Sequence, residues 1–212
     1  MPTQLESTLR GLGVVPVVAI DDPDDAAPLG SALAEGGLPI LEVTFRTAAA
    51  EAAIRRIVED CPGVMVGAGT VLTVEQADAA QAAGAAFAVS PGFNPTVVEH
   101  CLEIGLPIVP GVNSPTGVEQ GLAFGLTLLK FFPAVASGGL PMISALASPY
   151  PQVAFMPTGG ITEQSLGEWL ARPNVAAVGG TWIASKEALS THDFAGISRR
   201  TRVAHELAQH NQ

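Results

Sequence analysis

Lysine, cysteine and tyrosine are scarce in this chain of 212 residues. The two cysteines, Cys61 and Cys101, are too few for a framework of disulfide bonds, so a reducing cytoplasm is the expected location. No apolar run approaches the roughly 20 residues that a membrane-spanning helix needs. The first residues lack the basic and apolar segments of a signal peptide. These shortages exclude a disulfide-stapled scaffold and a membrane-spanning protein.

Positive charge is also scarce, with 10 Lys and Arg against 20 Asp and Glu and a formal net charge of −10. This excess of negative charge argues against nucleic acid and anionic membranes as partners. An anionic small molecule would have to be held by local dipoles and a few arginines. The composition is 48% hydrophobic and 14% charged, enough apolar material for a large core. The length fits a single domain, residues 1–212, better than two small ones.

Short apolar runs alternate with alanine-rich stretches along the chain. The runs are too continuous for an antiparallel sheet with one exposed face, and they indicate buried parallel strands. We predict strands at residues 14–20, 39–44, 64–68, 86–89, 107–109, 127–130, 153–156 and 175–178. We predict helices at residues 3–10, up to 36, 48–60, 74–83, 95–104, 116–124, 140–147, 162–170, from about 183, and 194–210.

This alternation amounts to about eight strand–helix units after an N-terminal helix. Such a pattern predicts a parallel sheet closed into a (β/α)8 TIM barrel. The alternative is an open, doubly wound sheet, which normally carries a glycine-rich phosphate turn after its first strand. Here that position holds the acidic residues 21–25, so we favour the barrel.

Lys130 stands near the end of a predicted buried strand and is one of only two lysines in the chain. Lysine is seldom buried without a partner or a task. Apolar surroundings favour the free amine over the ammonium ion, and a free amine can attack a carbonyl carbon. The plainer alternative is a lysine whose ammonium group reaches solvent at the strand end.

Polar candidates follow the other predicted strands, where a barrel has its functional face. Glu42, Thr44 and Arg46 alternate along the second strand and therefore point to one side. A carboxylate and a guanidinium then share the barrel mouth, unless they form only an internal ion pair. After the third strand, glycines allow close backbone approach to a ligand and Thr70 offers a hydroxyl.

Glycine pairs follow the seventh and eighth strands, as Gly159-Gly160 and Gly179-Gly180, each before a predicted helix. Backbone N–H groups and the positive end of a helix favour an anion at such turns, so the two pairs predict a phosphate site. A metal site is less favoured. Aspartates before a helix, such as residues 21–25, more often cap it than bind a cation, and no cluster of histidines and carboxylates stands at the strand ends.

Taken together, these residues resemble the 2-keto-3-deoxy-6-phosphogluconate (KDPG) aldolase family. The resemblance runs through nearly the whole chain in order rather than resting on one motif. The matching segments are LEVTFRT (41–47), GAGTV (67–71), SPG (90–92), PGV (110–112), LKFFPA (129–134), PTGGI (157–161) and GGTW (179–182).

The resemblance implies a class I aldolase that cleaves KDPG to pyruvate and glyceraldehyde 3-phosphate, with some activity on 4-hydroxy-2-oxoglutarate. It also implies a homotrimer of barrels that uses neither a metal nor a cofactor, because the substrate forms an imine with a lysine. Lys130 matches that lysine and Glu42 matches the general acid/base. The residues that match or suit the substrate pocket are Arg46, Thr70, Pro91, Phe132, Gly159, Gly160, Gly179, Gly180 and Thr181.

Two departures from the family pattern bear on substrate choice. Thr181 replaces a common serine, and the loop at residues 21–25 is acidic where several relatives have a basic residue. The sequence therefore leaves alternatives open. They are an aldolase for the galactonate epimer, a phosphate-binding barrel isomerase that forms no imine, and a non-enzymatic protein that binds a phosphorylated metabolite.

Overall fold

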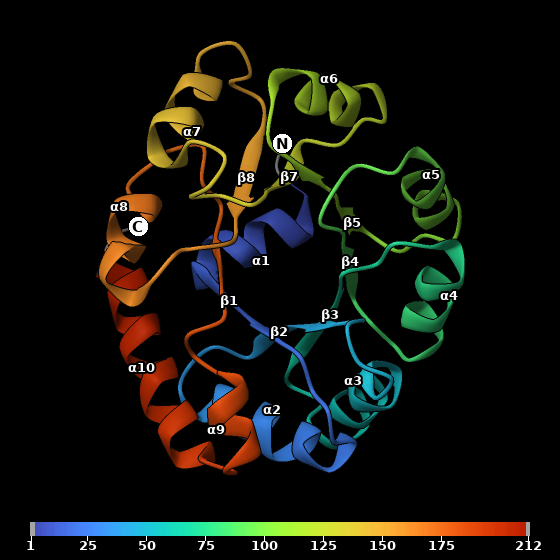
Figure 1. Cartoon of the computed structure of the whole chain (residues 1–212), viewed down its shortest axis with the longest axis vertical. Coiled ribbons are helices and arrows are strands. Elements are labelled where there is room, and N and C mark those ends of the chain that lie inside the picture. Colours follow the sequence, from blue (N-terminus) through green and yellow to red (C-terminus); the bar gives the residue numbers. More distant parts are fainter. Residues whose placement is uncertain (1–2, 211–212) are drawn as a thin grey trace.

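The computed structural model describes residues 3–210 and shows short strands in the middle of the molecule with helices around them (Figure 1). Residues 1, 2, 211 and 212, which complete the predicted domain, lie outside the described residues. The α-helices are α1 (Gln4–Leu12), α2 (Ala26–Glu35), α3 (Ala50–Asp60), α4 (Val74–Ala82), α5 (Pro95–Glu103), α6 (Pro115–Ala123), α7 (Gly139–Ala147), α8 (Leu166–Leu170), α9 (Lys186–Ser190) and α10 (Phe194–His210).

All strand pairs are parallel, as the continuous apolar runs predicted. The hydrogen-bonded orders are β5-β4-β3-β2-β1-β9 and β6-β7-β8. Isolated parallel bridges pair Phe155 of β8 with Val175, and Thr158 with Gly179 of β9. The strands are β1 (Val14–Val18), β2 (Ile40–Thr44), β3 (Met65–Gly69), β4 (Phe87–Val89), β5 (Ile108–Val109), β6 (Gly111–Val112), β7 (Leu128–Phe131), β8 (Ala154–Pro157) and β9 (Val178–Gly180). The result is an α/β fold with a curled parallel sheet.

Most predicted elements agree with the structure within a few residues, and the differences have local causes. The predicted fifth strand continues as β5 and β6 on either side of Pro110, which has no N–H group for a ladder. The predicted eighth strand begins later, at Val178, and Val175 forms only an isolated bridge. The helix expected from about 183 begins at Lys186, because the Ser185 side chain accepts a hydrogen bond from Ala188 N–H and caps it.

Side-chain alternation along the strands divides the core into two clusters. One lies between the strands and the helices, and includes the large side chains of α2 and α3. The other lies on the opposite face of the strands and is closed by Leu9 of α1. Ile40 of β2 and Leu128 of β7 belong to this inner cluster. Residues 42 and 130 lie two positions further along the same strands and therefore face the same interior.

No helix within residues 3–210 has the length and apolar character to cross a membrane. In Figure 1, α1 lies near the centre of the view, while α2 to α10 lie around the strands. The helices thus cover the outer faces of the strands and leave the interior to strand side chains and α1.

Cys101 on α5 is fully buried, and loss of solvation raises the pKa of its thiol to about 11. A pH of 8 is about three units below that pKa, so roughly one Cys101 thiol in a thousand is ionised at this pH. We expect Cys101 to resist iodoacetamide at pH 8 in the native protein and to react once guanidinium unfolds it. Peptide mass spectrometry would show this. Rapid labelling of native Cys101 would contradict the burial.

Candidate active site

A buried ion pair between Lys130 and Glu42 lies in the interior of the fold. The Lys130 Nζ lies 3.2 Å from Glu42 Oε1 and 3.4 Å from Oε2. The two side chains are only 6% and 1% exposed. The alternative of a lysine that reaches out to solvent is therefore wrong. Two charges brought out of water in this way require each other, because either one alone would be buried without compensation.

Strand alternation explains why the two residues meet although 88 positions separate them in the sequence. Each lies one step beyond the apolar inner cluster, Glu42 after Ile40 on β2 and Lys130 after Leu128 on β7. The ring of Phe132 lies beside the amine, with its centroid 5.4 Å from Nζ, close enough for a cation–π contact with the ammonium form. The amine thus has a carboxylate and an aromatic face as neighbours.

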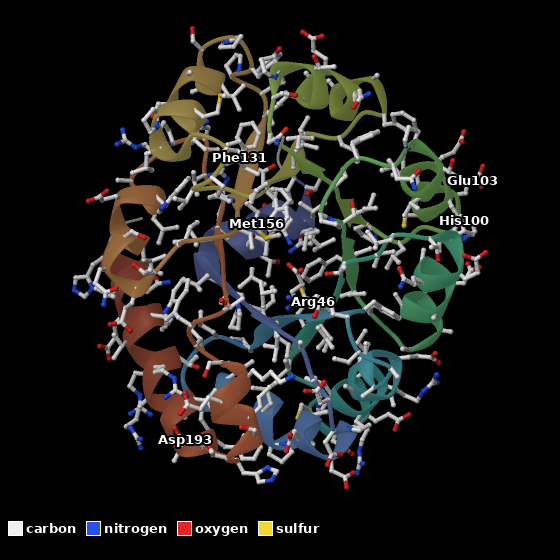
Figure 2. The ribbon with its side chains drawn as sticks, in the orientation of Figure 1. Arg46, His100, Glu103, Phe131, Met156 and Asp193 are labelled. Atoms are coloured by element: carbon white, nitrogen blue, oxygen red, sulfur yellow. The ribbon has the colours of Figure 1, made fainter. Side chains whose placement is uncertain are left out.

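A cavity of about 240 Å³ opens beside this pair at the carboxyl ends of the strands. Nearly all the predicted site residues line it, although they come from separate parts of the chain. Those predicted lining residues are Glu42, Arg46, Thr70, Pro91, Lys130, Phe132, Gly159, Gly160, Gly179 and Thr181. In Figure 2, Arg46 lies near the middle of the molecule, whereas His100, Glu103 and Asp193 lie toward its edge.

Arg46 does not form the internal ion pair with Glu42 that was the alternative on sequence grounds. Within the described part of the chain the carboxylate of Glu42 pairs with Lys130, and Arg46 Nε donates to Thr44 Oγ1 at 3.0 Å. Thr44 in turn donates to the Val18 carbonyl at 3.0 Å. This chain of bonds anchors an exposed arginine at the mouth of the cavity, where its guanidinium can meet a carboxylate.

Thr70 has a left-handed backbone with φ of 58°. A β-branched residue adopts this conformation rarely and at an energetic cost, and such strain is concentrated at functional sites. Thr70 follows directly after β3 and lines the cavity. The left-handed turn places a hydroxyl-bearing residue at the cavity instead of continuing the strand.

The first glycine loop has the geometry that only glycine accepts easily, with φ of 104° at Gly159 and 81° at Gly160. In the second pair, Gly179 lines the cavity but Gly180 does not. Alternation turns Gly180 to the other face, where an added Cβ would lie 1.9 Å from the Trp182 ring. Helix α9 starts at Lys186, a few residues later than the predicted start near residue 183, so its N-terminus is further from this pair than expected.

Sequence reasoning missed Thr158, which is 95% buried and lines the cavity. Its Oγ1 has no hydrogen-bond partner among residues 3–210. Thr158 directly follows β8 and has the same parity as the inward-facing Ala154 and Met156. Alternation applied one step past the strand end would have found it. A buried hydroxyl without a partner suits a polar group of a ligand.

The carboxylates of the acidic loop at residues 21–25 contact neighbouring backbone and side-chain groups. Asp22 accepts from the Asp24 N–H, Asp21 pairs with Lys186, and Asp25 lies 2.8 Å from His192 Nδ1. Nowhere in residues 3–210 do three His, Cys, Asp or Glu side chains gather closely enough to hold a metal ion. The Asp22 side chain therefore caps the short helical turn that follows it, as the sequence favoured, and Asp21 and Asp25 pair with Lys186 and His192.

A larger groove of about 610 Å³ lies at the other end of the strands, beside α1. Its charged groups are Glu6 and Arg10, which pair with each other at 2.9 Å. It offers no nucleophile next to a base. The smaller cavity, with an amine beside a carboxylate, is therefore the candidate active site.

The fold and this site define an α/β protein with a lysine-based centre suited to the chemistry of carbonyl compounds. A model of the KDPG and KHG aldolase family matches residues 5–200, and the chain belongs to this family.

Relatives cover almost the entire chain. A 2-dehydro-3-deoxy-phosphogluconate aldolase of Treponema pallidum (strain Nichols) is 52% identical over 190 residues, which are 90% of each chain. KDPG aldolase of Legionella pneumophila, solved with pyruvate captured at low pH as a covalent carbinolamine intermediate, is 40% identical with a TM-score of 0.92, covering 96% of this chain and 98% of its own. The aldolase of Zymomonas mobilis ZM4, solved with 3-phosphoglycerate, is 42% identical with a TM-score of 0.88, covering 95% of each chain.

Breaking the ion pair should destabilise the protein. We expect Lys130→Met to lower the free energy of unfolding by about 3–5 kcal/mol, because it leaves Glu42 buried without a cation. The double variant Lys130→Met/Glu42→Gln should lose less, since no charge remains to be buried. Guanidinium unfolding curves give both values. A double variant less stable than Lys130→Met alone would contradict this account of the pair.

Proposed function

We propose that this protein is a class I aldolase that cleaves KDPG to pyruvate and glyceraldehyde 3-phosphate through an imine on Lys130. The observation that carries the proposal is the buried contact of 3.2 Å between Lys130 and Glu42 beside the cavity. Family membership supports it, and so does the covalent pyruvate carbinolamine in the Legionella relative. No metal or cofactor enters the proposed chemistry, and the reaction makes the protein a carbon–carbon lyase.

The reaction begins when the free amine of Lys130 attacks the C2 carbonyl of the keto acid. Glu42 is close enough to take the ammonium proton from Nζ before this attack, which frees the amine, and then to give that proton to the departing oxygen. Loss of water from the carbinolamine gives an iminium ion. Its positive nitrogen then draws electrons from the bond between C3 and C4.

Cleavage requires a base for the hydroxyl at C4. Glu42, acting through a water molecule, takes that proton as the C3–C4 bond breaks, so glyceraldehyde 3-phosphate leaves and an enamine remains. Glu42 then returns the proton to C3. Hydrolysis of the resulting imine releases pyruvate and restores the amine.

Different residues of the cavity lining bind different parts of the substrate. Arg46 and Thr70 hold the carboxylate of the keto acid, and Pro91 and Phe132 pack against its carbon chain. The phosphate is held by backbone N–H groups of the two glycine loops and by Thr181. The Zymomonas relative, solved with 3-phosphoglycerate, supports a phosphorylated three-carbon ligand in this family.

We further propose that residues 1–212 form one (β/α)8 barrel domain, and that three copies assemble into a homotrimer in the cytoplasm. Counting β5 and β6 as one strand interrupted at Pro110 makes eight strands, which supports the barrel. The family resemblance supports the trimer, and the scarcity of cysteine supports a reducing compartment.

An isomerase that forms no imine, or a protein that only binds a phosphorylated metabolite, would not need the ion pair of Lys130 and Glu42. Burial of this amine and this carboxylate costs desolvation free energy, and neither alternative function explains that cost. We therefore favour the aldolase over both alternatives.

Incubation with pyruvate and sodium borohydride tests the imine directly. We expect digestion and mass spectrometry to find the reduced pyruvate adduct on Lys130, because borohydride converts the imine to a secondary amine that cannot be hydrolysed. EDTA should not change the result. Lys130→Arg provides the control and should show neither adduct nor turnover. An active protein that gives no adduct on Lys130 would favour the isomerase or another mechanism.

The choice between sugar epimers should depend on Thr181. Threonine keeps the hydroxyl of serine but adds a methyl group and a stiffer χ1, so it preserves a hydrogen bond while it narrows the space beside it. We expect KDPG to be preferred over the galactonate epimer by about 1–3 kcal/mol, or roughly 5- to 150-fold in kcat/KM. The unphosphorylated 4-hydroxy-2-oxoglutarate should react weakly.

Kinetics on both epimers measure this preference, with Thr181→Ser as the matched variant. A smaller preference in Thr181→Ser would assign the effect to the methyl group. Equal kcat/KM values for the two epimers in the unmodified protein would overturn the specificity argument and leave the aldolase proposal intact.

A further inference from the structure

We propose that Gly69 is a positioning residue for Glu42, since the absence of a side chain at residue 69 provides the space in which the Glu42 carboxylate lies. The inference rests on the proposed function, in which Glu42 is the acid and base. It explains a glycine that the proposed chemistry does not otherwise use.

The contact is close. A Cβ at Gly69 would lie 2.2 Å from Glu42 Oε1, 2.6 Å from Cγ and 2.8 Å from Cδ. Real Cβ atoms essentially never come within 3.0 Å of a heavy atom outside their own and the adjacent residues, so three atoms of Glu42 occupy the space that a side chain at residue 69 would need. The end of the Glu42 side chain thus lies directly over the Gly69 backbone. The same oxygen, Oε1, lies 3.2 Å from the Lys130 amine.

The strands themselves have little freedom to separate. Strands β2 and β3 pair over five residues, with Thr44 opposite Gly69, and Phe45 N–H donates to the Gly69 carbonyl at 2.7 Å. Gly69 itself has no left-handed φ, so alanine is compatible with its backbone. A methyl group at residue 69 would therefore displace the side chain of Glu42 and not the sheet. The cavity beside it, of about 240 Å³, has room for a displaced carboxylate.

The expected consequence is specific to the chemistry. A displaced carboxylate leaves the position from which it reaches both the Lys130 amine and the substrate, so proton transfer suffers while the protein stays folded. General acid–base catalysis typically contributes 10²- to 10⁴-fold. We therefore expect Gly69→Ala to lower kcat on KDPG by about 10²-fold or more.

The same strand supplies a matched control at Gly67. Residues 67 and 69 have the same parity on β3 and face the interior. A Cβ at Gly67 would lie 2.3 Å from the Phe87 ring, which belongs to the apolar inner cluster and not to the cavity lining. Gly67→Ala thus adds the same methyl group with a comparable overlap but against an apolar neighbour.

Kinetics and melting temperatures separate the two variants. Gly67→Ala should lower Tm through overpacking and change kcat by less than about tenfold. Gly69→Ala should lower kcat by 10²-fold or more and shift the limb of the kcat–pH profile that reports the general acid/base. If the two variants lose kcat to the same extent, and each loss follows the decrease in Tm, the inference is wrong. The effect of Gly69→Ala on kcat would then come from overpacking of the interior and not from displacement of Glu42.

A double-mutant cycle in Tm gives a second readout that needs no activity. In a Glu42→Ala background the atoms that oppose a methyl group at residue 69 are gone. Gly69→Ala should then cost little or no further Tm, while Gly67→Ala should cost as much as in the unmodified protein. An undiminished cost of Gly69→Ala in that background would also overturn the inference.

Borohydride trapping distinguishes failure of this inference from failure of the proposed function. If the unmodified protein gives the pyruvate adduct on Lys130 but Gly69→Ala behaves like Gly67→Ala, the aldolase assignment stands and the positioning role falls. If the unmodified protein cleaves no KDPG, the proposed function falls, and the Tm cycle still decides whether Gly69 makes space for Glu42.

Discussion

The burial of one lysine against one glutamate is the constraint on which the site depends. Neither charge is stable in this interior alone, and their contact at 3.2 Å compensates for the water that both have lost. Burying this ion pair costs more free energy than burying an apolar contact of the same size would. Such a costly arrangement in a folded interior is more readily explained by chemistry than by stability, which agrees with the family to which the chain belongs.

The parallel sheet makes this pair possible by placing side chains in successive layers. The apolar inner cluster, with Leu9 of α1, fills the interior below it. Glu42 and Lys130 form the next layer, and Arg46 and Thr181 lie exposed at the mouth. Glycine at particular strand positions then removes side chains where a functional group needs room. Gly69 accommodates Glu42, and Gly179 accommodates Thr158, whose Oγ1 would lie 2.2 Å from an added Cβ.

Simple periodicity predicted much of this architecture, because the strands are nearly uniform in apolar character and several helices, including α1, α4 and α6, begin at a side-chain cap. It placed Glu42, Thr44 and Arg46 on one side, and all three line the cavity. It failed where local geometry departs from a regular strand. Pro110 interrupts a ladder, and Thr158 lies one residue past the end of β8, which was predicted one residue too early.

The sequence by itself determined the order of strands and helices, the candidate lysine and the family resemblance, since these depend on local pattern and residue type. Only the tertiary structure decided that Lys130 pairs with Glu42, that Arg46 does not, and that Gly69 lies beneath the carboxylate. The physical reason is distance along the chain. Residues 42 and 130 are 88 positions apart and lie on β2 and β7, which do not pair with each other. Their contact depends on the register of all the strand pairs around the sheet, and no local sequence pattern encodes that register.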